Sequence, residues 1–575
     1  MDFKEKVVDA LHAVLHDLDK VRIAGMIEIP KQANLGDYAL PCYRLSGMLK
    51  KAPQEIAKEL KEKLVLPKGI SKTEVIGAYL NFFVANDALA KDVIKRILGE
   101  RQDYGKSDLL RGRKIMVEYS GPNTNKTLHL GHLRNQALGM AIANLYGANG
   151  AKVIRANIYS DRGAHICKSM LAYEKFGNKK TPQSAHIKPD RFVMDYYILY
   201  TKEAEKNPEL EKEVQEMLKK WEKGDKKTIA LWKKMNGWAL QGIRQTYKEF
   251  GSKFDAEFYE SKFYDKAQPV IERGLKKGIF EKDETGAIIA KLASSGMPDK
   301  VVMRADGTSI YITNDLALTK HKFEKYNLDE ALWVVGNEHS LYFRQLFKIF
   351  ELLGFPWAKK CRHMSYGLVN LPEGKMKSRE GTVVEADDII REMQELAKTE
   401  LQKRYPEMKK AELQRRTRAI SLAAVKFFML KVDAGRDFLF NPKESISFDG
   451  ETGPFVQYSY ARACSILKKA GKGTEAEIKN ANPEALESEI EKRLIALLAS
   501  YPSALQNCIS NMSLHPLCQH LLELSSAFNL FYHEMPVLRA ETKELRAARL
   551  ALVKAAKIVI ANALSVLDIE SIEEM

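Results

Sequence analysis

Residues 114–161 alternate between two apolar patterns, and this stretch constrains the fold more than any other part of the chain. "KIMVEYS", from Lys114, is typical of a buried strand, and "KVIRANIYSD", from Lys152, is typical of a second one. Between them, "LRNQALGMAIANLYGANG" has the pattern of a helix that ends at its glycines. Strand, helix and strand in this order predict a βαβ unit, which implies a parallel sheet and a right-handed crossover.

The flanking sequence predicts further domains. Residues 1–110 combine a helical period, a turn-rich loop and the alternating "VIGAYLNFFV", which indicates a small α+β domain. Residues 173–285 are charged and helix-like, so we expect a helical insertion within an α/β domain spanning 111–390. No strand pattern returns in 391–575, which predicts an all-α domain. The expected fold is a Rossmann-type α/β domain with a helical insertion, flanked by these two domains.

The charge of the chain favours a polyanionic partner. The formal net charge is +16 and the pI is near 9.2, so nucleic acid is the first expectation and an anionic membrane surface the second. Residues 401–440 hold ten lysines and arginines against four acidic residues, which suits phosphates. No apolar run is long enough to span a membrane, and no signal peptide is recognisable. The six cysteines lack metal-ligand or disulfide spacing, so we expect reduced thiols in the cytoplasm.

The loop of the βαβ unit carries the residues best suited to an anion. "NKTLHLGHLRN" places His129 and His132 three residues apart at the expected helix N-terminus, where free N–H groups and the macrodipole suit a phosphate. Gly131 leaves room for a ligand, and Lys126 adds a positive charge. In the other half of the domain, "EGKMKSREGT" offers further cations at Lys375 and Lys377. Such preorganised donors stabilise a developing pyrophosphate charge.

Each motif also has an ordinary interpretation. A His-x-x-His pair often occurs by chance, and a lysine-rich segment is usually a solvated loop. Glu118 could be an ordinary carboxylate at a strand end, and Tyr311 could belong to the core. The two motifs become specific because they occur together, in this order, on opposite halves of one predicted α/β domain.

The motifs resemble those of a known family. "HLGH" is similar to the HIGH signature, and "KMKSR" to a degenerate KMSKS signature, of class I aminoacyl-tRNA synthetases. "VEYSGPNTNKTLHLGHLRNQALG" resembles the bacterial type of the arginyl-tRNA synthetase family closely. The similarity covers essentially the whole chain. "NLGDYAL" and "GAYLNFFV" resemble the family's additional tRNA-binding domain, and "GETGPFVQYSYAR" its helical anticodon-binding domain.

The resemblance implies ATP-dependent ligation of L-arginine to the 3′-terminal adenosine of tRNA(Arg) through an arginyl-adenylate. His129 and His132 are then expected to hold the phosphates, and Lys126 to supply charge. The implied ATP site also includes Gly131, Lys375, Met376 and Ser378, with catalytic roles for Lys375 and Lys377. Ser378 is a departure, because the signature usually has lysine there. Lys126 is expected to compensate for it.

The arginine site implied by the resemblance comprises five residues: Glu118, Asn123, Tyr311, Asp315 and His339. Carboxylates and an aromatic face suit the planar guanidinium, and Asn123 is expected to hold the backbone end of the substrate. His339 is a second departure, because glutamine is frequent there.

The tRNA-binding candidates lie in both flanking domains. Tyr458 and Arg462 are four residues apart, so they share a helix face that could stack on unpaired bases. The alternative is that these aromatic residues pack between helices. Asn34 and Tyr38 in "NLGDY" are candidates for the tRNA elbow.

The implied partners are tRNA(Arg), L-arginine and ATP with Mg²⁺, for a monomer without membrane contact. The family also suggests that activation requires bound tRNA. Three rivals stay open: an adenylyltransferase of the same superfamily, a paralogue that binds RNA without catalysis, and a synthetase for another amino acid, against which the full-length resemblance to the arginine family argues. The long helical region argues against the first, and the presence of Lys126, His129 and His132 argues against the second.

Overall fold

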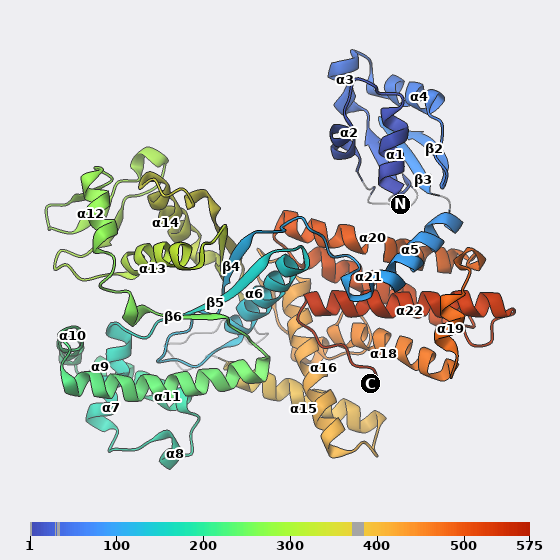
Figure 1. The fold of residues 1–575 in the computed structure, drawn as a ribbon. Coiled ribbons are helices and arrows are strands. Elements are labelled where there is room, and N and C mark those ends of the chain that lie inside the picture. Colours follow the sequence, from blue (N-terminus) through green and yellow to red (C-terminus); the bar gives the residue numbers. More distant parts are fainter. Residues whose placement is uncertain (1–2, 29, 31–34, 85, 371–383) are drawn as a thin grey trace. The chain divides into compact units, whose positions relative to one another are not determined.

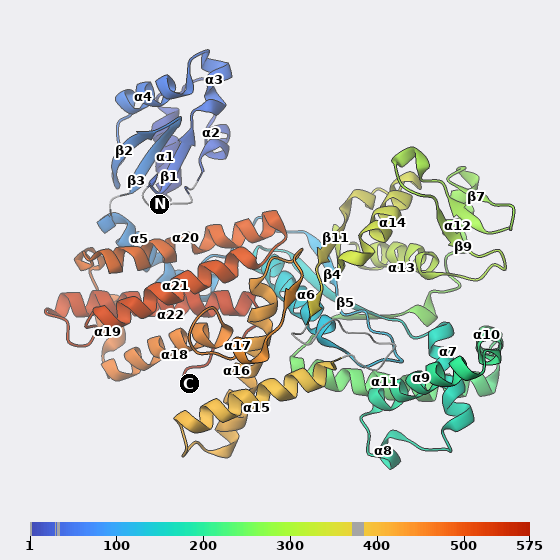
Figure 2. The ribbon, with the colours of Figure 1, turned by 180° about the vertical axis from the view of Figure 1, so that it is seen from behind.

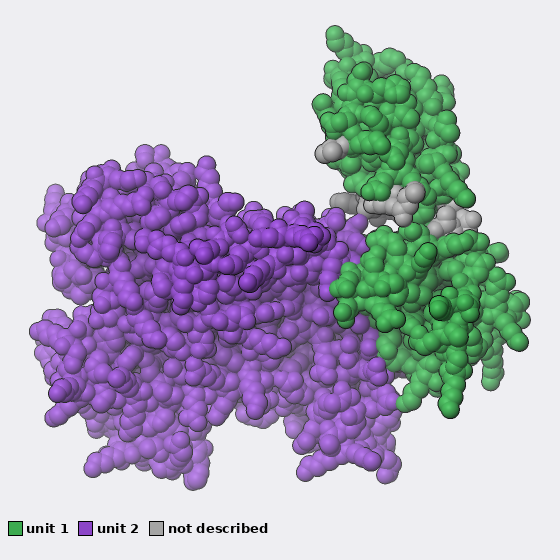
Figure 3. Space-filling view, viewed as in Figure 1, with its two compact units in different colours: residues 1–104, 462–501, 523–560 green, residues 105–461, 502–522, 561–575 purple. Residues whose placement is uncertain are grey.

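A computed structural model describes residues 3–28, 30, 35–84, 86–370 and 384–575 of the chain. The chain divides into two compact units, each assembled from segments that are distant in sequence (Figure 3). Unit 1 comprises residues 1–104, 462–501 and 523–560, and unit 2 comprises residues 105–461, 502–522 and 561–575.

The N-terminal residues form a three-stranded antiparallel sheet with helices packed on it (Figure 1). The sequence "VIGAYLNFFV" was expected to form one strand, but it turns back at Gly77, whose φ is +61°. The helical sequence "LSGMLKKAPQEIAKELKEKL" forms two helices, because the backbone of Lys50 is in the left-handed region and Pro53 begins the second helix. The elements are α1 (Phe3–His12), α2 (Lys20–Met26), β1 (Tyr38–Pro41), α3 (Tyr43–Leu49), α4 (Pro53–Lys63), β2 (Ile70–Ile76), β3 (Tyr79–Val84) and α5 (Asn86–Glu100).

Unit 2 is built on a five-stranded parallel sheet with the order β11-β10-β4-β5-β6. Its strands are β4 (Lys114–Glu118), β5 (Lys152–Tyr159), β6 (Ala256–Tyr259), β10 (Glu330–Gly336) and β11 (Cys361–Tyr366). The predicted βαβ unit is confirmed: α6 (Leu130–Ala148) connects β4 to β5. Gly139 lets α6 approach the sheet closely, because a Cβ at this position would lie 2.2 Å from the ring of Tyr119.

The order of the strands reverses beside β4. The chain proceeds from β4 outward to β5 and β6, and then returns to the other side of β4 with β10 and β11. The connections leaving β4 and β10 therefore diverge at the carboxyl ends of two neighbouring strands. Ligands bind at such a switch point in open α/β sheets.

The helical insertion is shorter than the predicted range 173–285. Its helices follow β5 and precede β6 in the chain, and they contact one another (Figures 1 and 2). They are α7 (Ala164–Phe176), α8 (Pro182–Ala185), α9 (Pro189–Lys206), α10 (Glu209–Glu222) and α11 (Lys226–Phe250). The end of the predicted range contains β6, an edge strand of the central sheet. With four residues, β6 is too short to show a clear period in the sequence.

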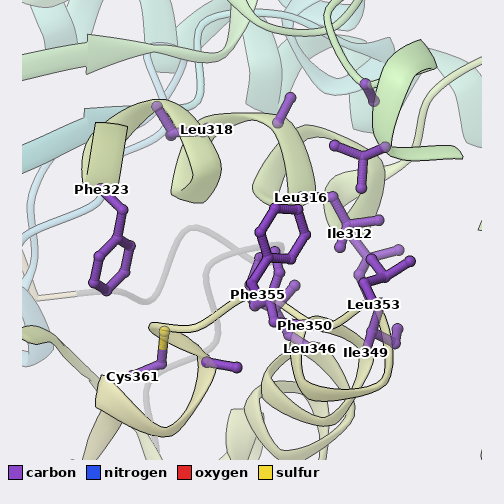
Figure 4. Close-up of a cluster of buried hydrophobic side chains, with 14 of the residues drawn as sticks. Ile312, Leu316, Leu318, Phe323, Leu346, Ile349, Phe350, Leu353, Phe355 and Cys361 are labelled. Carbon is purple, nitrogen blue, oxygen red and sulfur yellow. The ribbon is translucent and has the colours of Figure 1, made fainter. Parts of the chain in front are cut away.

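A second subdomain is formed by the segments that precede and follow β10 in the chain, between β6 and β11. A small antiparallel sheet is followed by a core in which α13 packs on α14 (Figure 4). Ile312 and Leu316 from α13 meet Ile349 and Phe350 from α14 in this core. The elements are α12 (Gln268–Lys276), β7 (Phe280–Lys282), β8 (Ile288–Ala290), β9 (Lys300–Met303), α13 (Tyr311–Tyr326) and α14 (Ser340–Leu352).

The chain after residue 384 is almost entirely helical, as expected. The prediction that no strand returns was wrong at β13 (Phe438–Leu439), which pairs in parallel with β12 (Val369–Asn370). Two residues are too few for a recognisable pattern. The helices are α15 (Ala386–Arg404), α16 (Lys410–Lys431), α17 (Pro442–Ser445), α18 (Gly453–Ala470), α19 (Thr474–Lys479), α20 (Glu489–Asn511), α21 (His515–Glu534) and α22 (Lys543–Val566). Within the described ranges, no helix has the length and apolar character needed to cross a bilayer.

Candidate active site

A cavity of about 500 Å³ opens at the switch point of the central sheet. The residues after β4, β10 and β11 line it, together with the first turn of α6. Seven predicted site residues are among the lining residues: Glu118, His129, Gly131, His132, Tyr311, Asp315 and His339. Asn123 and Lys126 do not line the cavity but lie in the loop between β4 and α6. Among these seven, residues separated by up to 221 positions in the chain thus meet at one site.

Carboxylates gather on one part of this lining, and each has a specific partner. Glu118 forms an ion pair with Lys322 of α13, and both side chains are buried. The Lys322 ammonium also lies 5.5 Å from the ring centroid of Trp333. Asp315 accepts a hydrogen bond from Tyr342. Burial raises the pKa of Asp315 to about 6, although Tyr342 and the charge of Lys322 lower it.

Glu260 is a third carboxylate in the cavity, and the sequence analysis missed it. It lies directly after β6 and accepts a hydrogen bond of 2.8 Å from the Ser160 hydroxyl. Burial, with the nearby charges of Asp315 and Asp161, raises the pKa of Glu260 to about 8. The cavity is also lined by the exposed Glu338. Of its four carboxylates, Asp315 and Glu260 have raised pKa values and Glu118 is paired with Lys322, so these three form a site that a cation would complete.

The two histidines form the N-terminus of α6 and are fixed by backbone hydrogen bonds. His129 caps the helix, and its Nδ1 accepts from the backbone N–H of Gly131 at 3.1 Å. Nδ1 of His132 accepts from the backbone N–H of His129 at 3.2 Å. Because both Nδ1 atoms are acceptors, the ring proton of each neutral imidazole lies on Nε2. Gly131 leaves room for the His129 ring, since a Cβ there would lie 3.0 Å from its Cε1.

Both imidazoles are neutral at physiological pH. Burial lowers the pKa of His129 to about 4, and the charge of Lys126 lowers it further. Burial, His129 and Lys126 lower the pKa of His132 well below its usual value. The ring centroids are 4.0 Å apart, so two imidazolium charges here would repel each other. The pair therefore offers neutral N–H donors beside the cation of Lys126.

The chain leaves β4 in a strained conformation held by polar side chains. Ser120 has φ of +79°, which is costly for a residue with a Cβ and is often found at functional sites. Its backbone N–H donates to Oδ1 of Asn135 at 2.5 Å, and its hydroxyl is 2.7 Å from that of Tyr247. Asn135 also donates to the Val334 carbonyl at 2.7 Å and to the Tyr366 hydroxyl at 3.0 Å. One side chain of α6 thus fixes the ends of β4, β10 and β11.

The remaining site predictions have different outcomes. Tyr311 is 58% exposed at the start of α13, which excludes the alternative that it is a core residue. His339 is exposed, 3.8 Å from the Glu338 carboxylate. The predictions for Asn34, Lys375, Met376, Lys377 and Ser378 lie outside the described residues.

The tRNA-binding candidates are placed as follows. Tyr458 is half-buried, and its ring meets that of Phe448 edge-on at 6.5 Å, which agrees with the packing alternative. Arg462 donates to Asn529 at 2.6 Å and lies 4.3 Å from the ring centroid of Tyr532. Tyr38 is half-buried at the start of β1.

Replacing Lys322 with methionine should destabilise the protein strongly. The change leaves the buried carboxylate of Glu118 without its counter-charge, which we expect to cost about 3–5 kcal/mol of unfolding free energy. The measurement is urea unfolding at neutral pH. Lys320→Met is the matched control, because Lys320 pairs with Glu324 at the surface and should contribute about 0–1 kcal/mol. Equal losses in the two variants would contradict a buried ion pair at Glu118.

Family comparisons agree with this architecture along the chain. Residues 93–442 match the model for "tRNA synthetases class I (R), catalytic domain", which contains the cavity. Residues 1–84 match "Arginyl tRNA synthetase N terminal domain", and residues 456–575 match "DALR anticodon binding domain".

Comparisons with individual proteins extend over the full length. An arginine–tRNA ligase of Treponema denticola is 43% identical over 560 residues, covering 96% of this chain and 94% of that protein. One from Clostridium acetobutylicum is 37% identical, with 100% of both chains covered. The solved arginyl-tRNA synthetase of Thermus thermophilus superposes with a TM-score of 0.83 at 25% identity, over 100% of both chains. The chain belongs to the arginyl-tRNA synthetase family.

Proposed function

We propose that this chain activates L-arginine with ATP and transfers it to the 3′-terminal adenosine of tRNA(Arg), and that both steps take place at the switch-point cavity. The observation that carries the proposal is the pairing, in one cavity, of the carboxylates of Glu118, Asp315 and Glu260 with a neutral histidine pair at a helix N-terminus. The first set suits a guanidinium, and the second suits a phosphate.

The carboxylate cluster binds the guanidinium of arginine. Glu118 already shares its charge with Lys322, so Asp315 and Glu260 supply the additional negative charge for the substrate. The planar fork of arginine can donate to several oxygens at once, whereas a lysine ammonium cannot match that geometry. Exposed Tyr311 offers an aromatic face at the edge of the same lining, and Asn123 and His339 are assigned to the backbone end of the substrate.

The histidine turn binds ATP. Nε2–H of His129 and of His132 donates to phosphate oxygens, and Lys126 neutralises charge that develops as pyrophosphate leaves. The Lys126 ammonium lies 5.3 Å from the ring centroid of Tyr197, and its charge acts on both imidazoles. The carboxylate of arginine attacks the α-phosphate, and the bond to pyrophosphate breaks. Neither this activation nor the later transfer to tRNA needs a covalent enzyme intermediate. Positioning and charge stabilisation therefore account for the catalysis.

The other parts of the proposal rest on the family. Residues 1–110 and 391–575 bind tRNA, with Asn34, Tyr38, Tyr458 and Arg462 as contacts, and Lys375 and Lys377 act on the triphosphate from the second half of the domain. Mg²⁺ accompanies ATP. The phosphates of ATP are expected to supply ligands for Mg²⁺. The enzyme acts in the cytoplasm as a monomer.

ATP–pyrophosphate exchange tests the function directly. We expect exchange with arginine alone among the twenty amino acids, and only when tRNA is added. Exchange without tRNA would keep the substrate but remove the requirement for tRNA. A protein that binds tRNA tightly and shows no exchange with any amino acid would be the non-catalytic paralogue.

Replacing Lys126 with alanine should reduce arginine-dependent exchange by about 100-fold or more, because one preorganised charge is lost near the leaving pyrophosphate. Affinity for tRNA, measured by filter binding, should stay nearly unchanged. Lys152→Ala is the matched control, since Lys152 is an exposed lysine at the opposite, amino end of β5 and should retain full activity. Wild-type exchange in Lys126→Ala would remove this residue from the mechanism.

Arginine binding should release protons. Near pH 7, Glu260 with a pKa of about 8 is mostly protonated, and a guanidinium beside it lowers that pKa. We therefore expect release of roughly one proton per arginine near pH 7, falling toward zero above about pH 9, where Glu260 is already ionised. Calorimetric titration in buffers of different ionisation enthalpy measures this number. Glu260→Gln should abolish most of the release, and identical heats in all buffers for the unmodified protein would contradict the assignment.

A further inference from the structure

Arg134 is a fully buried arginine in the helix that carries the two histidines. It lies two residues after His132 in α6, and its side chain is 0% exposed. Its guanidinium donates to four backbone carbonyls: those of Gly367 at 2.5 Å, Arg436 at 3.0 Å, Ala434 at 3.1 Å and Asp433 at 3.2 Å. One fork thus holds two separate turns of the chain against α6.

The charge of Arg134 is compensated in an unusual way. Among the described residues, no carboxylate accepts a hydrogen bond from it, and its Nε has no partner. The rings of Phe438 and Tyr366 lie 4.7 and 5.8 Å from the guanidinium carbon. Burial lowers the pKa of Arg134 to about 10, so the group still carries its charge at neutral pH. The charges of Asp437 and Asp433 act on Arg134 without hydrogen-bonding to it. Burying a charge without a hydrogen-bonded ionic partner is expensive, and an apolar residue would fill this volume at lower cost.

The carbonyls that Arg134 holds belong to the wall of the cavity and to the segment behind it. Residues 366–370 line the cavity and are joined to α6 by the hydrogen bond from Asn135 to the Tyr366 hydroxyl; we call them the nucleotide wall. Hydrogen bonds also connect this wall to residues 433–437. The Gly367 N–H donates to the Ala434 carbonyl at 2.8 Å, and Leu368 N–H donates to Asp437 at 2.6 Å. A Cβ on Gly367 would lie 2.5 Å from the backbone carbon of Arg436, so the two turns are in close contact.

We propose that Arg134 is a positioning residue for ATP: its guanidinium fixes the nucleotide wall, residues 366–370, relative to the histidine turn of α6 and so sets the width of the nucleotide side of the cavity. This inference rests on the proposed function. Arg134 does not line the cavity, so it acts through the carbonyl of Gly367 and the turn 433–436.

The arginine side of the cavity depends on other contacts. Glu118 is held by Lys322, Asp315 by Tyr342 and Glu260 by Ser160, and none of these hydrogen bonds involves Arg134 or the nucleotide wall. Loss of the Arg134 fork should therefore affect the two substrates unequally. A residue that only stabilised the fold would weaken the binding of both.

The test uses two variants of the full chain, Arg134→Lys and Arg134→Gln. The lysine keeps the charge but cannot donate to four carbonyls, and the glutamine loses the charge as well. We expect the KM for ATP in arginine-dependent exchange to rise about tenfold in Arg134→Lys and further in Arg134→Gln, with the KM for arginine changing less than about twofold. Equilibrium dialysis with ATP alone should show the same ratio between the variants.

Arg549→Lys is the matched control. Arg549 is also a buried arginine, but it pairs with the carboxylate of Glu491 at 2.7 Å, and neither side chain lines the cavity. Its thermal midpoint should fall without any change in the ratio of the two KM values. If Arg134→Lys behaves in the same way, or if both KM values rise by one common factor, the positioning role is wrong.

The failure of the proposed function gives a different result. A wild-type protein without arginine-dependent exchange would overturn that function. In that case, equilibrium dialysis can still measure the ATP affinity of the Arg134 variants and of the wild type. Unchanged ATP affinity in both variants would overturn the role of Arg134 independently.

Discussion

The site depends on one topological constraint, the reversal of strand order beside β4. Because the chain leaves β4 in one direction and returns to β10 on the other side, the connections that follow these two strands diverge at their carboxyl ends. The cavity occupies this place, and its lining comes from segments that meet only in the folded chain. Asn135 of α6 holds the ends of β4, β10 and β11 together, so the same helix that closes the βαβ unit also shapes the site.

Opposite electrostatic requirements are met within this one cavity. The proposed guanidinium side needs negative charge, but burial keeps Glu260 mostly protonated near pH 7, so the empty site avoids three adjacent ionised carboxylates. The phosphate side uses neutral imidazoles whose Nδ1 atoms are held by backbone N–H groups, with Lys126 as the full charge. Both sides are therefore preorganised without strong repulsion in the absence of substrate.

The sequence predicted the parts of this protein that have a local pattern. The βαβ unit and the histidine turn were confirmed because a buried strand, a capped helix and a short motif each leave a periodic or compositional signal. Glu260 was missed because β6, the strand before it, has only four residues, so this whole stretch was assigned to the helical insertion. The partner of Glu118 could not be predicted either, since Lys322 lies 204 positions away and looks like any other lysine of a charged helix. Contacts of this kind depend on tertiary packing alone.

Two buried cations illustrate why such contacts matter. Lys322 has a carboxylate partner, so the pair is a local ion pair whose loss leaves a charge uncompensated. Among the described residues, the hydrogen-bond acceptors of Arg134 are all backbone carbonyls, and Asp433 and Asp437 act on it only through their charge, so we infer that its benefit lies in geometry, because one planar fork can hold two turns at fixed directions from α6. Under the proposed function, the first cation sets the charge of the arginine side, and the second fixes the shape of the nucleotide side. Adenylate formation would then need both, because the reacting carboxylate and phosphate have to meet within one cavity.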